Sequence, residues 1–362
     1  MQIIDKYILA EFFRIFFLAM ITLIVFYEMV LFFDTAGYFI KHKSTFDEIS
    51  RFMLFKIPTA FFHVTPISTL MAAVLTTVSL ARHNEIVALK TSGVSMLRIA
   101  LPMIVAGGVI SVVSFVNNEY FVYLSAKEAK RIYYDEIKEQ PRKSLFSRDR
   151  FWYKADDGSI WNIGHIGEHA TSIKDLSIFY FDKAGTKIVK RVNAKEGELM
   201  GDEWLLKGFV ERDFFADGTF EEHSYSAHVL PAEAVPSADL DKVKLYPEEM
   251  NLVEMREYVR DIRSKGYDAT KYVVEMYAKI SFPLISLVIT LVAIPMGTRS
   301  SRAGGALIGV GVAVVTAGVF WFTFSLALAF GHAGRIPPLV AAYGTHFLFG
   351  GMGLSALVYG RN

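Results

Sequence analysis

Six long apolar runs constrain the fold of this chain more than any other feature. A helix needs about 20 mostly apolar residues to cross a bilayer, and each run is close to that length. They form two groups of three, separated by a long polar stretch: Ile15–Phe33, Ile57–Ala81, Ile99–Val116, Ile280–Thr298, Ala303–Phe330 and Ile336–Tyr359. The pattern predicts an α-helical membrane protein with six transmembrane helices in a three-plus-three arrangement. Asp5, Glu11 and Arg14 precede the first run and no small-residue cleavage site follows it, so we interpret it as a retained helix.

The composition supports this class and excludes several others. The 362 residues are 52% hydrophobic and only 21% charged, below the ~25% charged share of soluble domains. A net charge of +1 offers no basic field for nucleic acid. Because the chain has no cysteine, disulfides, thiol catalysis and thiolate metal sites are excluded. The chain also lacks a Gly-Lys dipeptide, so it carries no P-loop and is not itself a standard ATPase.

The stretch between the two helix groups is rich in strand signals. Short segments of aromatic and β-branched residues alternate with turn sequences such as Asp217-Gly218. The predicted strands are Phe151–Lys154, Ser159–Ile163, Leu176–Phe181, Lys187–Val192, Trp204–Val210 and Phe220–Leu230. Their regular spacing predicts an antiparallel sandwich or barrel-like domain. Two flanking stretches, Ser125–Lys138 and Met250–Ser264, have helical charge patterns and are expected to connect this domain to the membrane helices.

The chain therefore divides into three predicted parts. Residues 1–120 hold the first three membrane helices and a short cytoplasmic helix at about 83–97, residues 121–272 hold the strand domain with its helical connectors, and residues 273–362 hold the last three helices. Cytoplasmic loops carry an excess of Lys and Arg, which favours cytoplasmic termini. The inside segments would then hold Lys6, Arg14, Arg82, Lys90, Arg98, Arg299, Arg302 and Arg361, and the outside segments Lys41, Lys43, Arg51, Lys56 and Arg335. This orientation places the strand domain outside the cytoplasm.

The loop between the second and third runs is the most informative short segment. Ile86 and Leu89 share one helical face of this loop with Lys90, and Glu85 and Ala88 share another. The pattern predicts a short amphipathic helix along the cytoplasmic surface. One interpretation is an interfacial helix that anchors the two spans. The other is a docking helix for a soluble partner, because its small residues would permit close approach.

Several residues in or beside the apolar runs are candidates for a substrate path. A carboxylate at the depth of Glu28 is costly unless it faces protein or water, and both a structural hydrogen bond and a role in a pathway remain open. Lys41 and Lys43 either contact lipid phosphates, each worth roughly 1 kcal/mol near an anionic surface, or belong to a solvated loop. Gly305 and Gly309 form a G-x-x-x-G pair, which favours close helix packing and is compatible with packing that slides or opens.

One segment matches a metalloenzyme pattern. Residues 165–169, His-Ile-Gly-Glu-His, fit the inverted zinc-protease motif. That chemistry requires a helix that puts both histidines on one face. Gly164 and Gly167 lie in a strand-and-turn region, which argues against a helix. We therefore expect a surface turn here, with no metal site and no catalytic residue in the chain.

Taken together, these features resemble the LptF/LptG family of lipopolysaccharide-export permeases over essentially the whole chain. The three-plus-three arrangement and the inserted strand domain both fit. Four sequence segments fit as well: Ile4-Asp5-Lys6-Tyr7-Ile8, the loop from Arg82 to Gly93, Lys279-Ile280-Ser281-Phe282-Pro283-Leu284, and Gly334-Arg335-Ile336-Pro337-Pro338. The last of these, with the N-terminal segment, is more similar to the LptG branch than to the LptF branch.

The resemblance implies a transport permease without its own ATPase activity, which extracts lipopolysaccharide from the inner membrane and passes it to a periplasmic β-jellyroll bridge. The protein would be a multi-pass protein of the bacterial inner membrane, with cytoplasmic N- and C-termini and a periplasmic β-jellyroll-like domain. Expected partners are a cytoplasmic ATPase dimer similar to LptB, a second permease similar to LptF, and a periplasmic jellyroll protein similar to LptC or LptA. The chain would bind no cofactor itself, because ATP and Mg²⁺ would act in the partner ATPase.

The resemblance also implies two groups of site residues. The ATPase-coupling segment would comprise His83, Asn84, Glu85, Val87, Ala88, Ser92 and Gly93. The substrate gate, formed by the first and fifth spans, would involve Glu28, Lys41, Lys43, Gly305 and Gly309. Two other functions stay open from the residues alone: a permease that exports another lipid or a lipoprotein, and a membrane-anchored binding or sensor protein without transport.

Overall fold

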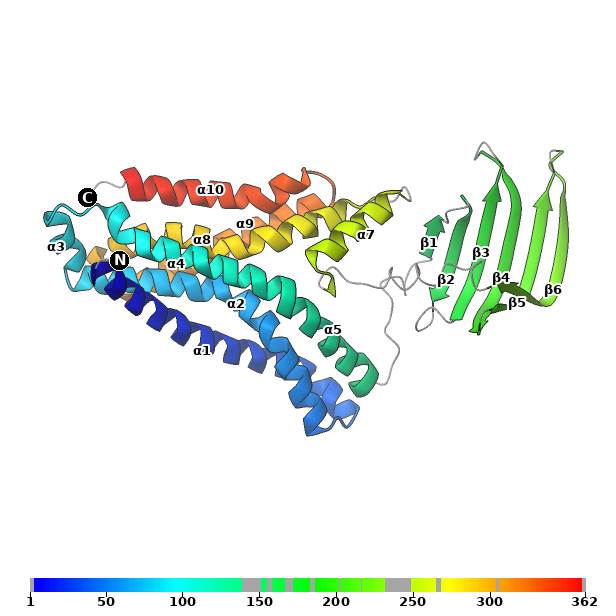
Figure 1. The fold of residues 1–362 in the computed structure, drawn as a ribbon, viewed down its shortest axis with the longest axis horizontal. Coiled ribbons are helices and arrows are strands. Elements are labelled where there is room, and N and C mark those ends of the chain that lie inside the picture. Colours follow the sequence, from blue (N-terminus) through cyan, green and yellow to red (C-terminus); the bar gives the residue numbers. More distant parts are fainter. Residues whose placement is uncertain are drawn as a thin grey trace. The chain divides into compact units, whose positions relative to one another are not determined.

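The computed structural model describes residues 3–138, 151–154, 158–166, 172–182, 186–201, 203–215, 217–231, 249–264, 268–303 and 306–359. Its helical segments are α1 (Ile3–Lys41), α2 (Phe46–Arg82), α3 (Glu85–Thr91), α4 (Met96–Val116), η1 (Asn117–Val122), α5 (Tyr123–Arg131), η2 (Ile132–Ile137), α7 (Leu252–Ser264), α8 (Thr270–Ala303), α9 (Ala306–His332) and α10 (Pro338–Tyr359) (Figure 1). Its strands are β1 (Phe151–Lys154), β2 (Ile160–Ile166), β3 (Ser172–Phe181), β4 (Ile188–Met200), β5 (Glu203–Phe214) and β6 (Phe220–Pro231).

The chain forms two compact units. The helical unit comprises residues 1–133, 247–260 and 268–362, and the sheet unit comprises residues 134–246 and 261–267. The predicted middle part, 121–272, included two helical connectors. Their contacts assign most of both connectors to the helical unit, because α5 continues directly from α4 through η1 and α7 packs beside it.

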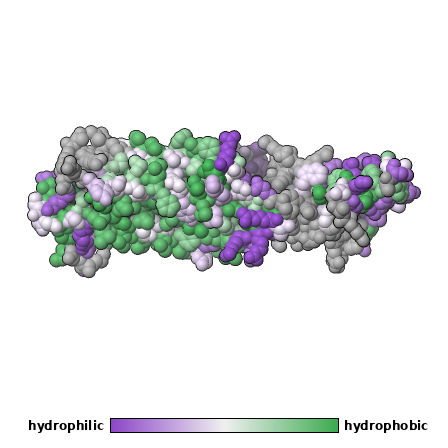
Figure 2. All heavy atoms as spheres, turned by 90° about the horizontal axis from the view of Figure 1, so that it is seen from above, coloured by the Kyte–Doolittle hydropathy of each residue, from purple (hydrophilic) through white to green (hydrophobic). Residues whose placement is uncertain are grey.

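Five helical segments in the described residues are long and apolar enough to cross a membrane. They are Ile3–Lys41, Phe46–Arg82, Met96–Tyr134, Thr270–Thr298 and Val314–His332. The sixth predicted run is also a helix, the 22-residue α10, but it is not among these five. Its glycines and His346 dilute its hydropathy. Figure 2 shows that hydrophobic residues cover most of the visible face of the helical unit, as expected for a surface in contact with lipid.

The helix α1 extends well beyond the predicted span on both sides. Its 39 residues correspond to about 58 Å at 1.5 Å per residue, roughly twice the thickness of a bilayer core. Asp34 and Lys41 therefore lie on α1 itself rather than in a loop, and Lys43 follows in the turn with a left-handed φ of 52°. The next helix begins with a capping box, in which Thr45 and Glu48 satisfy each other's backbone N–H groups.

The core of the helical unit combines apolar side chains with buried hydroxyls. Ile8, Phe12 and Phe16 of α1 belong to the same buried cluster as residues of α2, α4, α8 and α10. Several hydroxyls on α2 bond within their own helix: Thr69 Oγ1 donates to the Thr65 carbonyl at 2.7 Å, and Thr77 Oγ1 donates to the Ala73 carbonyl at 2.6 Å. Such internal bonds leave a smooth helix surface, so the helices can approach closely.

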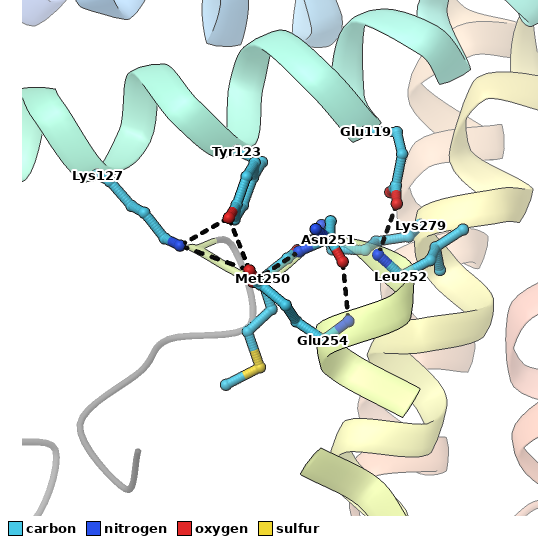
Figure 3. Close-up of polar contacts among 8 residues, drawn as sticks. All are labelled: Glu119, Tyr123, Lys127, Met250, Asn251, Leu252, Glu254 and Lys279. Carbon is cyan, nitrogen blue, oxygen red and sulfur yellow. Dashed lines mark hydrogen bonds and ion pairs between the residues drawn. The ribbon is translucent and has the colours of Figure 1, made fainter. Parts of the chain in front are cut away.

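Polar contacts fasten α7 to the α4–α5 segment (Figure 3). Tyr123 Oη donates to Glu254 Oε1 at 2.7 Å. Lys127 Nζ lies 2.9 Å from Tyr123 Oη and 3.8 Å from Glu254 Oε1. At the start of α7, Asn251 Oδ1 accepts a hydrogen bond from the Glu254 backbone N–H at 2.8 Å. The same glutamate therefore joins the helix cap to the neighbouring helix.

Two further contacts in the same region join α7 to its other neighbours (Figure 3). Glu119 Oε1, on η1, accepts a hydrogen bond from the Leu252 backbone N–H at 2.8 Å. Lys279 Nζ, on α8, donates to the Met250 carbonyl at 2.6 Å. Backbone groups at the start of α7 are thus bonded by two different helices, which fixes where the chain re-enters the helical unit.

All six predicted strands are present and form one antiparallel sheet in the order β1-β2-β3-β4-β5-β6. Each strand pairs with the next in sequence, so the described strands form a meander. One face of the sheet carries the buried cluster Trp161, Ile163, Ile173, Leu176, Ile178, Val192, Ala194, Trp204, Leu206 and Phe209. The strands that the structure describes thus form a single sheet, with no second sheet among them.

A line of irregular positions crosses the sheet. In β3, Asp175 has a left-handed φ of 53°, and in β5, Gly208 has a φ of 65°. The strands keep the same register on both sides of these two residues, so no extra residue is inserted. At Asp175 the left-handed backbone interrupts the alternation of side chains, and Ile173 and Leu176, three positions apart, therefore face the same core.

Candidate functional site

The candidate coupling site is the turn that carries α3 between α2 and α4. Asn84 adopts a left-handed φ of 57°, a conformation that asparagine tolerates better than most residues. At the other end, Gly93 has a φ of 85°, which favours glycine. Ser95 then caps α4 by accepting a hydrogen bond from the Arg98 backbone N–H at 3.3 Å. These local signals reduce the helix predicted over 83–97 to Glu85–Thr91.

This short helix has one face held by the protein and one face free. Ile86 is buried in the main apolar cluster, and Leu89 packs against that cluster. On the opposite side, four exposed residues form a surface that we call the docking face: Val87, Ala88, Thr91 and Ser92. Thr91 Oγ1 and Ser92 Oγ both donate to the Ala88 carbonyl at 2.9 Å. The docking face is therefore small, and these hydroxyl protons are already used within the helix.

The seven predicted coupling residues take different positions around this helix. Val87, Ala88 and Ser92 belong to the docking face, and Gly93 is exposed beside it. His83 caps the end of α2, with Nδ1 2.9 Å from the Ser79 carbonyl oxygen. Asn84 forms the turn, and Glu85 begins α3. The fold brings these residues together on one short segment, and their role in coupling remains a prediction.

Sequence reasoning missed the residues that hold this segment from α1. Tyr7 Oη donates to Glu85 Oε1 at 3.1 Å. Arg98 donates from Nη1 to Asp5 Oδ1 at 2.7 Å and from Nη2 to Asp5 Oδ2 at 3.0 Å. The first turns of α1 therefore contact residues on both sides of the docking face. No local pattern predicts these pairs, because their members are 78 and 93 positions apart.

Of the predicted gate residues, Glu28 and Lys41 lie on α1 and Lys43 lies in the turn that follows it. Both carboxylate oxygens of Glu28 are buried and have no hydrogen-bond partner among the described residues, although Lys56 on α2 is near enough to attract them electrostatically. Lys41 and Lys43 are exposed. Gly305 lies outside the described residues, and Gly309 lies in the first turns of α9, where no side-chain environment is described.

The zinc-protease pattern falls partly outside the described residues. His165 lies on β2, where it pairs with Lys174 of β3, so its backbone is extended rather than helical. Glu168 and His169 are outside the described residues. Within the part of the chain that the structure describes, no group of three or more His, Cys, Asp or Glu residues is arranged to hold a metal ion.

The fold and the site define a class of protein: a multi-span helical membrane protein with a strand domain inserted between two helix groups and a short loop helix that presents a docking face. Within that class, residues 6–359 match the sequence profile described as lipopolysaccharide export system permease LptF/LptG, and the chain belongs to this family. It is similar to the lipopolysaccharide export system permease protein LptG of Escherichia coli strain K12, with 22% identity over 286 residues that cover 76% of each chain. The LptG protein of Escherichia coli O6:H1 strain CFT073 gives the same values.

Family membership settles the broad function. The chain is a permease of a lipopolysaccharide export system and is not itself the ATPase of that transporter. It is a multi-pass membrane protein that works with the other components of a transporter complex. The resemblance inferred from the sequence is thereby confirmed, and so is the transport function.

Proposed function

We propose that this permease couples ATP hydrolysis in a cytoplasmic ATPase dimer to the extraction of lipopolysaccharide, and that α3 receives the force. The observation that carries the proposal is the docking face, which is exposed and small while Ile86 anchors the helix from behind. A partner can pack closely against such a face, since tight complementarity depends on shape. The chain lacks a P-loop, so the nucleotide chemistry must come from the partner, which resembles LptB in this proposal.

In this proposal, α10 is a sixth span, both termini are cytoplasmic, and the strand domain is a periplasmic jellyroll, all in the bacterial inner membrane. Two observations support this topology. The first turns of α1 contact Glu85 and Arg98, so the start of the chain and α3 lie at the same end of the helical unit. An even number of spans returns the chain to the side where it began. The basic residues Arg82, Lys90 and Arg98 flank this end.

The substrate gate is proposed to lie along α1 and α9. Only 17% of the most apolar window of each of these helices is buried inside the described structure, whereas the other three candidate spans are 50–72% buried. Helices this exposed are suited to face lipid or the matching helices of a second, LptF-like permease. Glu28, Lys41 and Lys43 on and beside α1, and Gly305 and Gly309 at the start of α9, would then contribute to the gate. The two exposed lysines are suited to lipid phosphates.

Extraction of the substrate requires an energy source and an apolar path. Each methylene taken from the bilayer costs about 0.8 kcal/mol when exposed, so a lipid with several acyl chains does not leave the membrane unaided. ATP hydrolysis in the partner would supply the energy. The apolar face of the sheet, carried by residues such as Trp204 and Phe209, is suited to receive acyl chains, and LptC- or LptA-like jellyroll proteins would take them onward.

The partners are tested by mass spectrometry of the gently purified complex. We expect an ATPase, a sister permease and bound lipopolysaccharide. A complex that carries ordinary phospholipid and no ATPase would contradict this assembly.

Coupling is tested with Glu85→Ala in proteoliposomes that contain the whole complex and a periplasmic acceptor protein. We expect ATP hydrolysis to continue while the lipopolysaccharide released per ATP falls about tenfold, which corresponds to ~1.4 kcal/mol of coupling. Glu11→Ala is the matched control, because Glu11 lies on α1 and its contact with Arg14 is a weak one of 3.9 Å. Normal release per ATP in Glu85→Ala would refute the assignment of α3.

A further inference from the structure

The contact between Asp5 and Arg98 is stronger than an ordinary surface ion pair. Two parallel hydrogen bonds of 2.7 and 3.0 Å join the guanidinium to both carboxylate oxygens. The Asp5 side chain is only 12% exposed. Bidentate pairs of this geometry fix the relative orientation of their partners as well as their distance. By comparison, the Arg14–Glu11 pair on the same helix spans 3.9 Å with the arginine 82% exposed, and such pairs contribute little.

The Tyr7–Glu85 bond adds a second point of attachment. Glu85 is the first residue of α3 and Arg98 lies in the first turn of α4. The start of α1 is therefore bonded on both sides of the docking face. Ile8 and Phe12, one to two turns further along α1, have no exposed surface and share the buried cluster with Ile86. Polar bonds and packing together make this end of α1 and the α3 turn one body.

Beyond this end, α1 is built as an uninterrupted rod. It contains no glycine or proline from Ile3 to Ala36. In contrast, α2, α4 and α8 each contain at least one internal proline, and sharp kinks in helices arise mostly at such positions. A displacement applied at the start of α1 is therefore transmitted along the helix, whereas the proline-containing helices can absorb it by bending.

We propose that Asp5, Tyr7 and Arg98 are positioning residues that fasten α1 to the coupling segment, so that α1 moves with α3 during the ATP cycle. This inference rests on the proposed function of α3 and names the connection through which force reaches the gate. The link is direct: it passes from α3 and the start of α4 to α1 without passing through α2.

The movement of α1 can be measured with spin labels in the full complex. The chain contains no cysteine, so Ile40→Cys on α1 and Phe347→Cys on α10 introduce two unique labelling sites, at side chains that are 78% and 79% exposed. We expect the distance between the labels to change between the nucleotide-free and ATP-trapped states. In Arg98→Ala and Asp5→Ala, we expect that change to disappear and the lipopolysaccharide released per ATP to fall about tenfold, equivalent to ~1.4 kcal/mol of coupling.

Two variants separate a lost link from a damaged fold. The exchanged pair, Asp5→Arg with Arg98→Asp, restores an ion pair between α1 and α4 and is expected to recover part of the distance change. Arg98→Lys keeps the charge but loses the bidentate geometry, so its distance change should be intermediate. Arg14→Ala is the matched control and should behave as the wild-type protein, since Arg14 is largely exposed.

The results distinguish this inference from the proposed function. Suppose that Glu85→Ala uncouples transport, while Asp5→Ala and Arg98→Ala keep both the distance change and normal release. This result would overturn the link to α1 and leave the role of α3 intact. If Glu85→Ala transports normally, the proposed function itself fails. The inference is also overturned if three results occur together: the single variants lose the distance change, the exchanged pair does not recover it, and Arg98→Lys behaves as the wild-type protein. The bidentate pair would then not be the link.

Discussion

Replacement of Gly353 by alanine tests how closely α10 packs on α8. A Cβ atom at this position would lie 2.8 Å from the Leu291 carbonyl carbon, 2.9 Å from its oxygen and 2.9 Å from the Val292 nitrogen. These are backbone atoms of a helix, so they cannot move aside by a rotamer change. Ordinary contact begins at 3.4 Å, and the difference, 3.4 − 2.8 Å, means that the two helices must separate locally by about 0.6 Å.

The expected cost follows from two opposing terms. Overpacking of a well-packed contact costs about 1–3 kcal/mol, and the replacement of a helical glycine by alanine returns about 0.5–1 kcal/mol through reduced backbone freedom. Gly351, on the same helix, is the matched control because no atom lies within 4 Å of its Cβ position. At Gly351, alanine only reduces the backbone freedom of the unfolded chain, which is stabilising. The difference in unfolding free energy between the two variants therefore isolates the overlap, and we expect Gly353→Ala to be less stable than Gly351→Ala by about 1–3 kcal/mol.

The measurement is thermal or denaturant unfolding of the purified protein in one detergent, followed by helix signal for both variants in parallel. A shared detergent cancels the effect of the micelle on each value. If the two variants agree within about 0.5 kcal/mol, the scale of ordinary surface substitutions, the close approach of α10 to α8 at Gly353 is refuted. The assignment of α10 as a packed membrane helix would then lose its main physical support.

Two further predictions concern other contacts. Glu249 is 2% exposed and its Oε1 lies 2.6 Å from Lys130 Nζ, so Glu249→Ala should cost about 2–4 kcal/mol of unfolding free energy; the double variant with Lys130→Met should recover most of this loss, and no recovery would refute the pairing. Asp182 accepts backbone hydrogen bonds from Thr186 and Lys187, and these hold the pKa of its carboxyl below the usual value. The stabilisation is present above the unfolded-state pKa, about 3.9, and is lost as pH falls through the lower folded-state pKa. In a series of unfolding measurements at different pH values, Asp182→Asn should remove this loss of unfolding free energy at acidic pH. An unchanged pH dependence would contradict the prediction.

The helices and strands were predictable because their signals are local. Apolar length identifies a membrane helix, and aromatic and β-branched segments between turns identify strands. Their ends were less accurate for a physical reason. Past Phe33, α1 continues because Thr35 and Phe39 are buried on one side while Asp34 is exposed on the other, so a polar residue does not mark the end of the helix. In β3, the left-handed backbone at Asp175 interrupts the alternation of side chains while the register with β4 stays the same, and this interruption conceals the full strand from a period-two pattern.

The candidate site was also predictable where its signals are local and not predictable where it joins residues far apart in sequence. The turn that carries α3 was predictable from its own residues, because Gly93 and the small residues near it are adjacent in sequence. Its attachment to α1 was not, because Asp5 and Arg98 find each other only after the helices have packed. Glu28 illustrates the other limit: the sequence admits a structural hydrogen bond, yet neither of its carboxylate oxygens bonds to any described residue. A charged residue in an apolar run therefore indicates that the cost of burying its charge must be offset, but the sequence does not identify the residue that offsets it.

The distribution of polar contacts in the helical unit explains why its variants should fail in different ways. Directional bonds between helices include the α1–α4 contact made by Asp5 and Arg98 and the α5–α7 contact made by Tyr123 and Glu254. Elsewhere, hydrogen bonds such as the one that the Leu287 backbone N–H donates to Ser111 Oγ accompany contacts that depend on shape, as at Gly353. A variant at Gly353 should therefore change stability first, whereas a variant at Arg98 should change the transmission of movement first. Stability and transport per ATP, measured on the same set of variants, separate these two roles.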